Sequence, residues 1–336
     1  MALTEFELIR RYFATSTLAF DSPDVILGPG DDGAIIAVPP GQQLVMSMDT
    51  LNEAVHFPSG ADPFLLAQRC LLVNLSDLAA MGAEPLGFTL ALSMPQAEAG
   101  WLQAFSEGLA EIAVRERCPL LGGDTTKGPL SVTIQAHGSV PAGQAILRSG
   151  ARPGDAIYVT GQLGDAAAAL WWMLKDERFD DTLMDGAEEQ ALRQAFYQPE
   201  SRIQAGIALR YLASAGLDIS DGLASDLQHI LQASSKDGRV PGAELYADKL
   251  PCSEVFRQRV RPDQQEALAL SGGDDYELCV CIPPHAEQTA CDAMQQLDIA
   301  FTRIGEVTST AGLVVVGADG GRSALQSAGY LHFSHP

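Results

Sequence analysis

The sequence is poor in basic residues. Its 336 residues include 21 Lys and Arg against 43 Asp and Glu, which gives a formal net charge of −22 at pH 7. Binding to nucleic acid or to an anionic membrane surface depends on basic side chains that meet phosphate groups. We therefore expect neither nucleic acid nor a membrane among the partners. Phosphorylated small molecules stay compatible with this composition, provided that divalent cations supply the positive charge.

Long apolar runs and paired cysteine motifs are also missing. Gly, Asp, Asn or Arg interrupts every apolar stretch that could cross a bilayer, and the first six residues lack the basic and apolar regions of a secretory signal. The six cysteines contain no C-x-x-C, and Cys279 and Cys281 alternate along one predicted strand as two buried thiols would. Because structural disulfides belong to oxidising compartments, we expect a reduced protein in the cytoplasm.

The common phosphate-binding and hydrolytic motifs are absent as well. Gly122–Lys127 reads G-G-D-T-T-K without the G-K-[ST] ending of a Walker A loop, and the sequence has no H-R-D with D-F-G, no H-E-x-x-H and no G-x-S-x-G. Gly28–Gly33 does match G-x-G-x-x-G. However, Asp31 and Asp32 occupy the place of the diphosphate, and the following residues alternate like a strand instead of opening a helix. We interpret this stretch as an acidic, metal-binding loop.

The order of predicted elements indicates an α/β (α+β) protein with two domains of comparable size. Arg148–Asp155 is the best candidate boundary, so we place an N-terminal domain at residues 1–147 and a C-terminal domain at 148–336. Apolar periodicity predicts helices over 3–13, 63–81, 98–115, 166–174, 201–213 and 285–297, and strands over 25–27, 43–50, 86–92, 130–140, 156–160, 216–219 and 278–282. Residues 175–190 are weakly patterned, and a further strand is expected to end in 271–277. Taken singly, Asp124 could be a turn former after two glycines.

Aspartates recur at the ends of predicted strands and on the inward stripe of one helix: Asp31, Asp32, Asp49, Asp77, Asp124, Asp218 and Asp221. Taken singly, most have a plain alternative, such as helix N-cap for Asp221 or loop residue for Asp49. Asp77 is harder to dismiss, because it continues the apolar stripe of the 63–81 helix, where a lone carboxylate is costly. Carboxylates that converge must become protonated or bind metal, and their oxygens suit Mg²⁺.

Seven segments together make the chain resemble the thiamine-monophosphate kinase family along nearly its full length. They are Gly30–Asp32, Ser47–Thr50 with His56-Phe57, Val73–Ala83, Gly122–Thr126, Arg148–Gly150, Asp218–Leu223 and Ser271–Glu277. The resemblance implies Mg²⁺-assisted, in-line transfer of the ATP γ-phosphoryl group to thiamine monophosphate, without a general base. It also implies the two-domain aminoimidazole ribonucleotide synthetase-like fold. In that fold the N-terminal mixed sheets of a homodimer form a β-barrel, and the C-terminal domain is an α/β sandwich.

The resemblance further implies roles for individual residues. The expected ligands of several Mg²⁺ ions are Asp32, Ser47, Met48 (through its carbonyl), Asp49, Asp77, Asp124, Asp218 and Asp221, of which Asp77, Asp124 and Asp218 are expected to be essential. The expected ATP contacts are Gly123, Asp124, Arg148 and Ser220, and the expected contacts to thiamine monophosphate are His56, Asp274 and Tyr330. Family members often carry a hydroxyl residue in place of Met48 and Glu in place of Asp274.

Two other interpretations stay open. One is a sister enzyme of the same fold: aminoimidazole ribonucleotide synthetase, selenophosphate synthetase or the hydrogenase-maturation dehydratase. No Cys precedes Cys70, which disfavours the second, and residues 333–336 lack the Cys of the third. The other interpretation is a sensor that binds Mg²⁺ and ATP without turnover.

Overall fold

The computed structural model describes residues 5–325, so the predicted substrate contact Tyr330 lies outside the described residues. The chain divides into two compact units, one of residues 1–78 and 83–144 and the other of residues 79–82 and 145–336. The predicted boundary between residues 147 and 148 stays a prediction. Within residues 5–325, no helix combines the length and the apolar character needed to cross a membrane.

A four-stranded mixed sheet with the order β3-β6-β4-β5 forms the centre of the N-terminal unit. The strands are β3 (Gln42–Asn52), β4 (Glu84–Met94), β5 (Leu120–Lys127) and β6 (Ser131–Pro141). β6 pairs antiparallel with both β3 and β4, whereas β4 and β5 run parallel. β3 is therefore an edge strand, and its register runs from Gln42 opposite Pro141 to Asn52 opposite Ser131.

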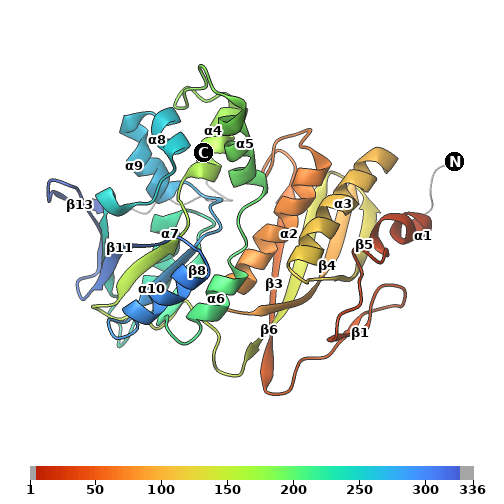
Figure 1. Ribbon diagram of the computed structural model, residues 1–336, viewed down its shortest axis with the longest axis horizontal. Helices are drawn as coiled ribbons and strands as arrows, with labels where there is room; N and C mark the ends of the chain where they lie inside the picture. Colours follow the sequence, from red (N-terminus) through yellow and green to blue (C-terminus); the bar gives the residue numbers. More distant parts are fainter. Residues whose placement is uncertain (1–4, 326–336) are drawn as a thin grey trace. The chain divides into compact units, whose positions relative to one another are not determined.

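Two helices, α2 (Pro63–Ala80) and α3 (Ala99–Arg115), cover one face of this sheet (Figure 1). Asp62 caps α2, because its Oδ1 accepts the N–H groups of Phe64 and Leu65 at 2.9 and 3.2 Å. The Asp-Pro pair at the start of the helix predicts this cap. Before the sheet, the chain forms α1 (Glu5–Leu8), the π-helical turn η1 (Ile9–Phe13) and a hairpin of β1 (Val25–Leu27) and β2 (Ile35–Ile36). The acidic loop connects the two strands of this hairpin.

A seven-stranded sheet with the order β13-β12-β9-β11-β7-β10-β8 forms the centre of the C-terminal unit. The strands are β7 (Ala156–Thr160), β8 (Ala215–Asp218), β9 (Gly242–Tyr246), β10 (Leu278–Ile282), β11 (Phe301–Thr308), β12 (Gly312–Val316) and β13 (Arg322–Leu325). All neighbours pair antiparallel except β9 and β12. Cys279 and Cys281 on β10 are fully buried free thiols, as predicted.

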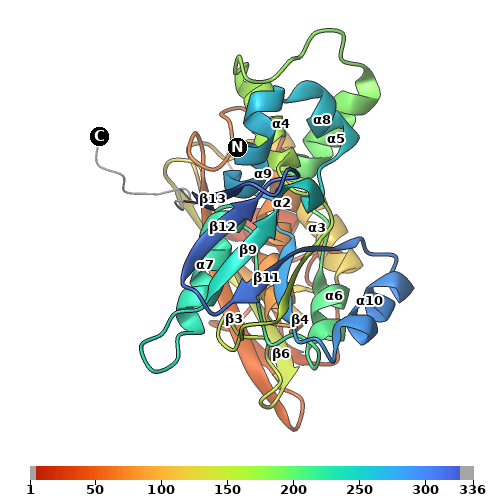
Figure 2. The same cartoon turned by 90° about the vertical axis from the view of Figure 1, so that its left-hand side faces the viewer.

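Helices cover both faces of the C-terminal sheet, with α6 and α10 on one face and α7 and α9 on the other (Figure 2). The helices of this unit are α4 (Asp165–Leu174), α5 (Gly186–Tyr197), α6 (Ile203–Leu209), α7 (Leu223–Ala233), α8 (Glu254–Arg259), α9 (Pro262–Ser271) and α10 (Glu287–Gln296), with a 3₁₀ turn η2 at Ala247–Lys249. This arrangement is an α/β sandwich.

The structure corrects two expectations about elements and excludes one alternative. Helix α5 begins inside the weakly patterned stretch 175–190, and α9 replaces the strand expected before the 271–277 loop. Asp124 lies in strand β5 and not in a turn. β5 continues through its two glycines because β4 offers a parallel partner along this whole length, which local turn propensity does not reveal.

Candidate active site

Strand β3 presents Ser47 and Asp49 on the face of the sheet that α2 covers. The strand alternates, so that Leu44, Met46 and Met48 are 40%, 58% and 62% exposed on the opposite face. The hydroxyl of Ser47 donates a hydrogen bond to Oδ2 of Asp77 on α2. The structure thus brings two of the predicted metal ligands into contact, whereas the side chain of Met48 points away from them.

Asn74 on α2 ties this helix to strand β3. Its Oδ1 accepts the backbone N–H of Asp49 at 3.0 Å, and its Nδ2 donates to the carbonyl of Cys70 at 2.9 Å. Asn74 is fully buried. Because β3 is an edge strand, this amide satisfies a backbone donor that has no strand partner on that side. Asn74 therefore fixes the position of Asp49 relative to the helix that carries Asp77.

His56 lies in the turn that follows β3. Its Nδ1 accepts the backbone N–H of Asn52 at 3.0 Å. A neutral imidazole whose Nδ1 accepts a hydrogen bond carries its proton on Nε2, so the ring has a defined tautomer. The hydrogen bond from Asn52, the last residue of β3, therefore fixes the orientation of the His56 ring, which is a predicted substrate contact.

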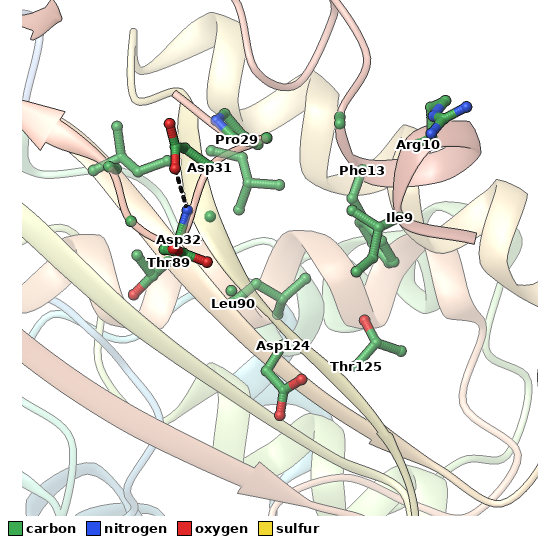
Figure 3. A pocket seen from close by; sticks show the side chains of 18 residues that line it. Ile9, Arg10, Phe13, Pro29, Asp31, Asp32, Thr89, Leu90, Asp124 and Thr125 are labelled. Atoms are coloured by element: carbon green, nitrogen blue, oxygen red, sulfur yellow. Dashed lines mark hydrogen bonds between the residues drawn. The ribbon is translucent and has the colours of Figure 1, made fainter. Parts of the chain in front are cut away.

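A cavity of about 880 Å³ lies between the acidic loop and strand β5. Figure 3 shows the carboxylates of Asp32 and Asp124 on one side of this space and the apolar side chains of Ile9 and Phe13 on the other. The backbone N–H of Asp32 donates to Oδ1 of Asp31 at 2.8 Å, which shapes the loop. Two segments more than 90 residues apart in the chain therefore bring carboxylates to one cavity.

Gly123 allows strand β5 to lie close to its neighbour, strand β4. Its φ is +152°, and a Cβ at this position would lie 1.8 Å from the carbonyl oxygen of Leu90. Any other residue would have to push the two strands apart. Asp124 follows directly and pairs opposite Ala91 in the parallel ladder. The glycine therefore places the Asp124 carboxylate by letting its strand pack closely.

The C-terminal unit carries its own acidic loop after strand β8. Asp218 ends the strand and is buried, and the backbone N–H groups of Ser220 and Asp221 both donate to Oδ2 of Asp226 at 3.0 Å. Burial raises the pKa of Asp226 to about 6, against which these hydrogen bonds and the positive charge of Arg148 act. Helix α7 begins after Gly222, so the N-cap alternative for Asp221 is wrong.

The 271–277 loop packs directly on this second acidic loop. The backbone N–H of Asp274 donates to the carbonyl of Ser220 at 2.9 Å, and that of Tyr276 donates to the carbonyl of Ile219 at 2.8 Å. The predicted substrate contact Asp274 and the predicted nucleotide contact Ser220 therefore lie on adjoining backbone segments. Sequence reasoning assigned no role to Asp226, Asn74 or Tyr276. Asn74 and Tyr276 lie in segments that carry the family resemblance, and Asp226 lies in the first turn of α7, so each had a signal in the sequence.

The donor atoms of these groups suit a hard divalent cation. Within the part of the chain that the structure describes, no three His, Cys, Asp or Glu side chains are close enough to hold a metal ion by themselves. Ser47 and Asp77, which are hydrogen bonded, and Asp32 and Asp124, which line the same cavity, offer oxygen atoms only. Mg²⁺ typically takes one or two carboxylates and completes its shell with water and substrate phosphates, so this donor set fits Mg²⁺.

The chain is similar to known proteins both in its sequence and in its fold. The family models "AIR synthase related protein, N-terminal domain" and "AIR synthase related protein, C-terminal domain" match residues 30–140 and 152–318. The thiamine-monophosphate kinase of Escherichia coli K12 is 43% identical over 336 residues, which are 100% of each chain. The crystal structure of thiamine-monophosphate kinase from Stenotrophomonas maltophilia K279a has a TM-score of 0.83 and 41% identity, covering 95% of this chain and 98% of that one. AaThiL complexed with AMPPCP and TMP has a TM-score of 0.74 and 28% identity, covering 90% and 91%.

Proposed function

Because the chain belongs to the thiamine-monophosphate kinase family, we propose that it transfers the γ-phosphoryl group of ATP directly to the phosphate of thiamine monophosphate, giving thiamine diphosphate and ADP. The observation that carries this proposal is the identity with the Escherichia coli kinase over the full length of both chains. The AaThiL complex supports it, because that relative was solved with AMPPCP and TMP together.

We place the nucleotide in the cavity between the acidic loop and β5. Its volume of about 880 Å³ suffices for a ligand of this size. Ile9, Phe13 and Leu90 offer an apolar surface to the base, and Gly123 leaves the backbone of β5 open to close approach. Asp124 also lines this cavity, where its carboxylate would hold Mg²⁺ beside the phosphates. Arg148 and Ser220, from the C-terminal unit, are proposed as further ATP contacts.

Charge balance requires Mg²⁺ in this proposal. Both substrates are anions, and Arg10 is the one cationic side chain among the described residues that line the cavity. The proposed ligands are Asp32, Ser47, Asp49, Asp77, Asp124, Asp218, Asp221 and the carbonyl of Met48. Bound Mg²⁺ would neutralise and align the two phosphate groups.

The side chains of the protein then act mainly by holding the metal ligands and the substrates in position. Ser47 and Asn74 fix Asp77 and Asp49 in place, and His56, Asp274 and Tyr330 are proposed to bind thiamine monophosphate. No side chain is needed as a general base, because the attacking phosphate oxygen is already anionic near neutral pH. Positioning and electrostatics therefore supply the catalysis.

We also propose a homodimer in the cytoplasm. Leu44, Met46 and Met48 form an exposed apolar row on edge strand β3, and such a strand is normally covered by a partner or interrupted by charges. A second copy that pairs its N-terminal sheet with this one would form the β-barrel that the family resemblance implies. Six free cysteines fit a reducing compartment.

The proposal is tested by incubating the purified protein with Mg²⁺, ATP and thiamine monophosphate and by quantifying all products. We expect thiamine diphosphate and ADP in equal amounts, no product when Mg²⁺ is chelated, and none with unphosphorylated thiamine as acceptor. ATP binding without any product would overturn the kinase and leave the sensor. Turnover of the substrates of a sister enzyme, but not of thiamine monophosphate, would favour that enzyme instead.

A pair of matched variants connects the activity to the cavity. Asp124→Asn is expected to lower kcat at least about 100-fold, because it removes a carboxylate ligand of the Mg²⁺ that the phosphates need for charge neutralisation. Asp263→Asn changes an exposed aspartate that pairs with Arg261 at 2.8 Å on the surface and is expected to leave turnover unchanged. Equal activity of both variants would contradict the placement of the reaction in this cavity.

A further inference from the structure

The 271–277 loop holds two non-glycine residues in the left-handed region of backbone space. Asp274 has a φ of +71° and Tyr276 has a φ of +49°. Aspartate tolerates this region, whereas a bulky aromatic residue is an outlier there. Backbone strain of this kind persists only where the surroundings determine the conformation, and it is concentrated at functional sites. The strained backbone therefore indicates that this turn, which includes Tyr276, has a function.

Polar contacts of buried side chains hold the middle and the C-terminal end of the strained turn. Asp275 accepts the backbone N–H of Gly164 at 2.8 and 3.1 Å through its two oxygens. Glu277 forms a two-pronged ion pair with Arg202 at 2.6 and 2.7 Å and accepts the hydroxyl of Thr160 at 2.6 Å. These charge-assisted contacts leave the backbone no route to relax, so the side chains of the turn have fixed starting points.

The turn is also fastened to the acidic loop after β8. Besides the hydrogen bonds of Asp274 and Tyr276 to that loop, a Cβ on Gly273 would lie 2.6 Å from the carbonyl oxygen of Ser220. The two backbones therefore touch without side chains between them. A shift of the turn would displace the loop that carries Ser220 and Asp221.

Within this fixed frame, the hydroxyl of Tyr276 donates a hydrogen bond to Oδ1 of Asp274 at 3.1 Å. The bond favours the orientation of the Asp274 carboxylate in which Oδ1 faces the Tyr276 ring hydroxyl. Since a carboxylate repels a phosphate but attracts a cation or an amine donor, Asp274 suits the thiazolium and aminopyrimidine groups of thiamine better than the phosphate.

We propose that Tyr276 is a positioning residue that orients the Asp274 carboxylate toward the cationic thiamine portion of the acceptor. The inference rests on the proposed kinase function. It assigns specificity for the organic part of the acceptor to the Tyr276–Asp274 pair, separately from the groups that handle the phosphates.

The test is steady-state kinetics with Tyr276→Phe, which keeps the ring and removes only the hydroxyl. We expect the KM for thiamine monophosphate to rise about tenfold, with the KM for ATP and kcat within about twofold of wild type. In an Asp274→Ala background, Tyr276→Phe is expected to cause no further rise, because the group that it orients is gone. Asp274→Asn keeps the hydrogen-bond acceptor but loses the charge, and it is expected to raise the same KM.

Tyr158→Phe is the matched control. Its hydroxyl also donates to a carboxylate at 3.1 Å, that of Glu287, on a different part of the C-terminal unit. This variant is expected to keep every kinetic constant of wild type. Wild-type protein that makes no thiamine diphosphate would overturn the proposed function and the inference together. Wild-type turnover combined with an unchanged Tyr276→Phe variant, with equal rises in both KM values, or with additive effects in the Asp274→Ala background would overturn the inference alone.

Discussion

Two uncharged residues, Gly123 and Asn74, decide where the carboxylates of the N-terminal unit lie. Gly123 lets β5 approach the Leu90 carbonyl, and Asn74 holds the backbone of Asp49 against α2. Both act on backbone geometry, and neither offers a charge to a substrate. Substituting them therefore tests the architecture of the site separately from its chemistry.

Gly123→Ala is expected to destabilise the protein by about 3 kcal/mol or more and to weaken ATP binding, because the new Cβ would overlap the Leu90 carbonyl. Gly122→Ala is the control, since no atom lies within 4 Å of its Cβ position. Chemical unfolding and titration calorimetry with ATP measure the two effects. Equal stability of the two variants would contradict the close contact between position 123 and the Leu90 carbonyl.

Asn74→Ala is expected to raise the Mg²⁺ concentration for half-maximal activity about tenfold and to cost about 1–3 kcal/mol of stability, because it removes the acceptor of the half-buried backbone N–H of Asp49. Thr50→Val, which removes a hydrogen bond to Thr133 on the exposed face of the same strand, is expected to change neither quantity. Activity measured as a function of the Mg²⁺ concentration gives the half-maximal value for each variant. An unchanged curve for Asn74→Ala would refute its role in placing Asp49.

Sequence spacing can place Asp77 but cannot place its partners. The apolar stripe of α2 predicts that Asp77 turns inward, and Leu66, Cys70 and Val73 of that stripe are buried. The contacts of Asp49 with Asn74 and of Ser47 with Asp77 join residues 25 and 30 positions apart. Such contacts depend on how strand and helix pack, which periodicity in either element leaves open.

At the scale of elements, a helix is predicted where a start signal precedes a clear apolar stripe, and it is missed where the stripe is weak. The Asp62-Pro63 start predicts α2 correctly, whereas α5 has mostly exposed polar residues and buries chiefly Leu192, Phe196 and Tyr197. Its capping box of Asp185 and Glu188 is a local signal that periodicity alone overlooks. The sequence predicts a strand in place of α9 because its buried residues, Leu268–Leu270, are consecutive, a pattern that fits both a strand and a helix.

The start of helix α4 contains a carboxyl group that makes stability depend on pH. Burial raises the pKa of Asp165 from 3.8 to about 6, against a hydrogen bond from Ser253 at 2.6 Å. Between pH 4 and 6 the folded protein therefore keeps a proton that the unfolded chain releases. The contribution of this group is present below pH 4 and is lost as the pH rises through 6.

Asp165→Asn is accordingly expected to raise the Tm by about 2–4 °C at pH 7.5 and to leave it unchanged near pH 4, because asparagine keeps the acceptor and removes the buried charge. Hydrogen bonds from Gln264 and Arg261 lower the pKa of exposed Asp263, so Asp263→Asn should show the opposite sign. Thermal unfolding across this pH range measures both. A rise for Asp165→Asn that is equal at both pH values would mean that the charge is not its cause.

For the whole molecule, the predicted two-domain fold of the aminoimidazole ribonucleotide synthetase group is confirmed by both family models and by the structural matches. Its α/β sandwich and its mixed N-terminal sheet appear as expected. The closed β-barrel stays a prediction, because it requires a second chain. The sequence predicts this fold through the resemblance to a known family. The periodicity of apolar residues alone predicts only a protein of two α/β domains.

The dimer is tested with Met46→Lys, which places a charge in the exposed row of β3. We expect wild type to sediment with twice the mass of one chain and Met46→Lys to weaken association at least about tenfold. Val114→Lys is the control, since Val114 is 57% exposed on α3, the helix layer of the opposite face, and Met46 is 58% exposed. A monomeric wild type, or dissociation caused equally by both variants, would contradict the proposed interface.

The strict alternation of β3 limits how this strand can change during evolution. Substitutions alter one face at a time, because Ser47 and Asp49 face α2 while Met46 and Met48 face outward. Insertion or deletion of a single residue would exchange the two faces and turn the methionines toward Asp77. We therefore expect the length of this strand to be inherited unchanged among related proteins, even where the identities of its outward residues drift.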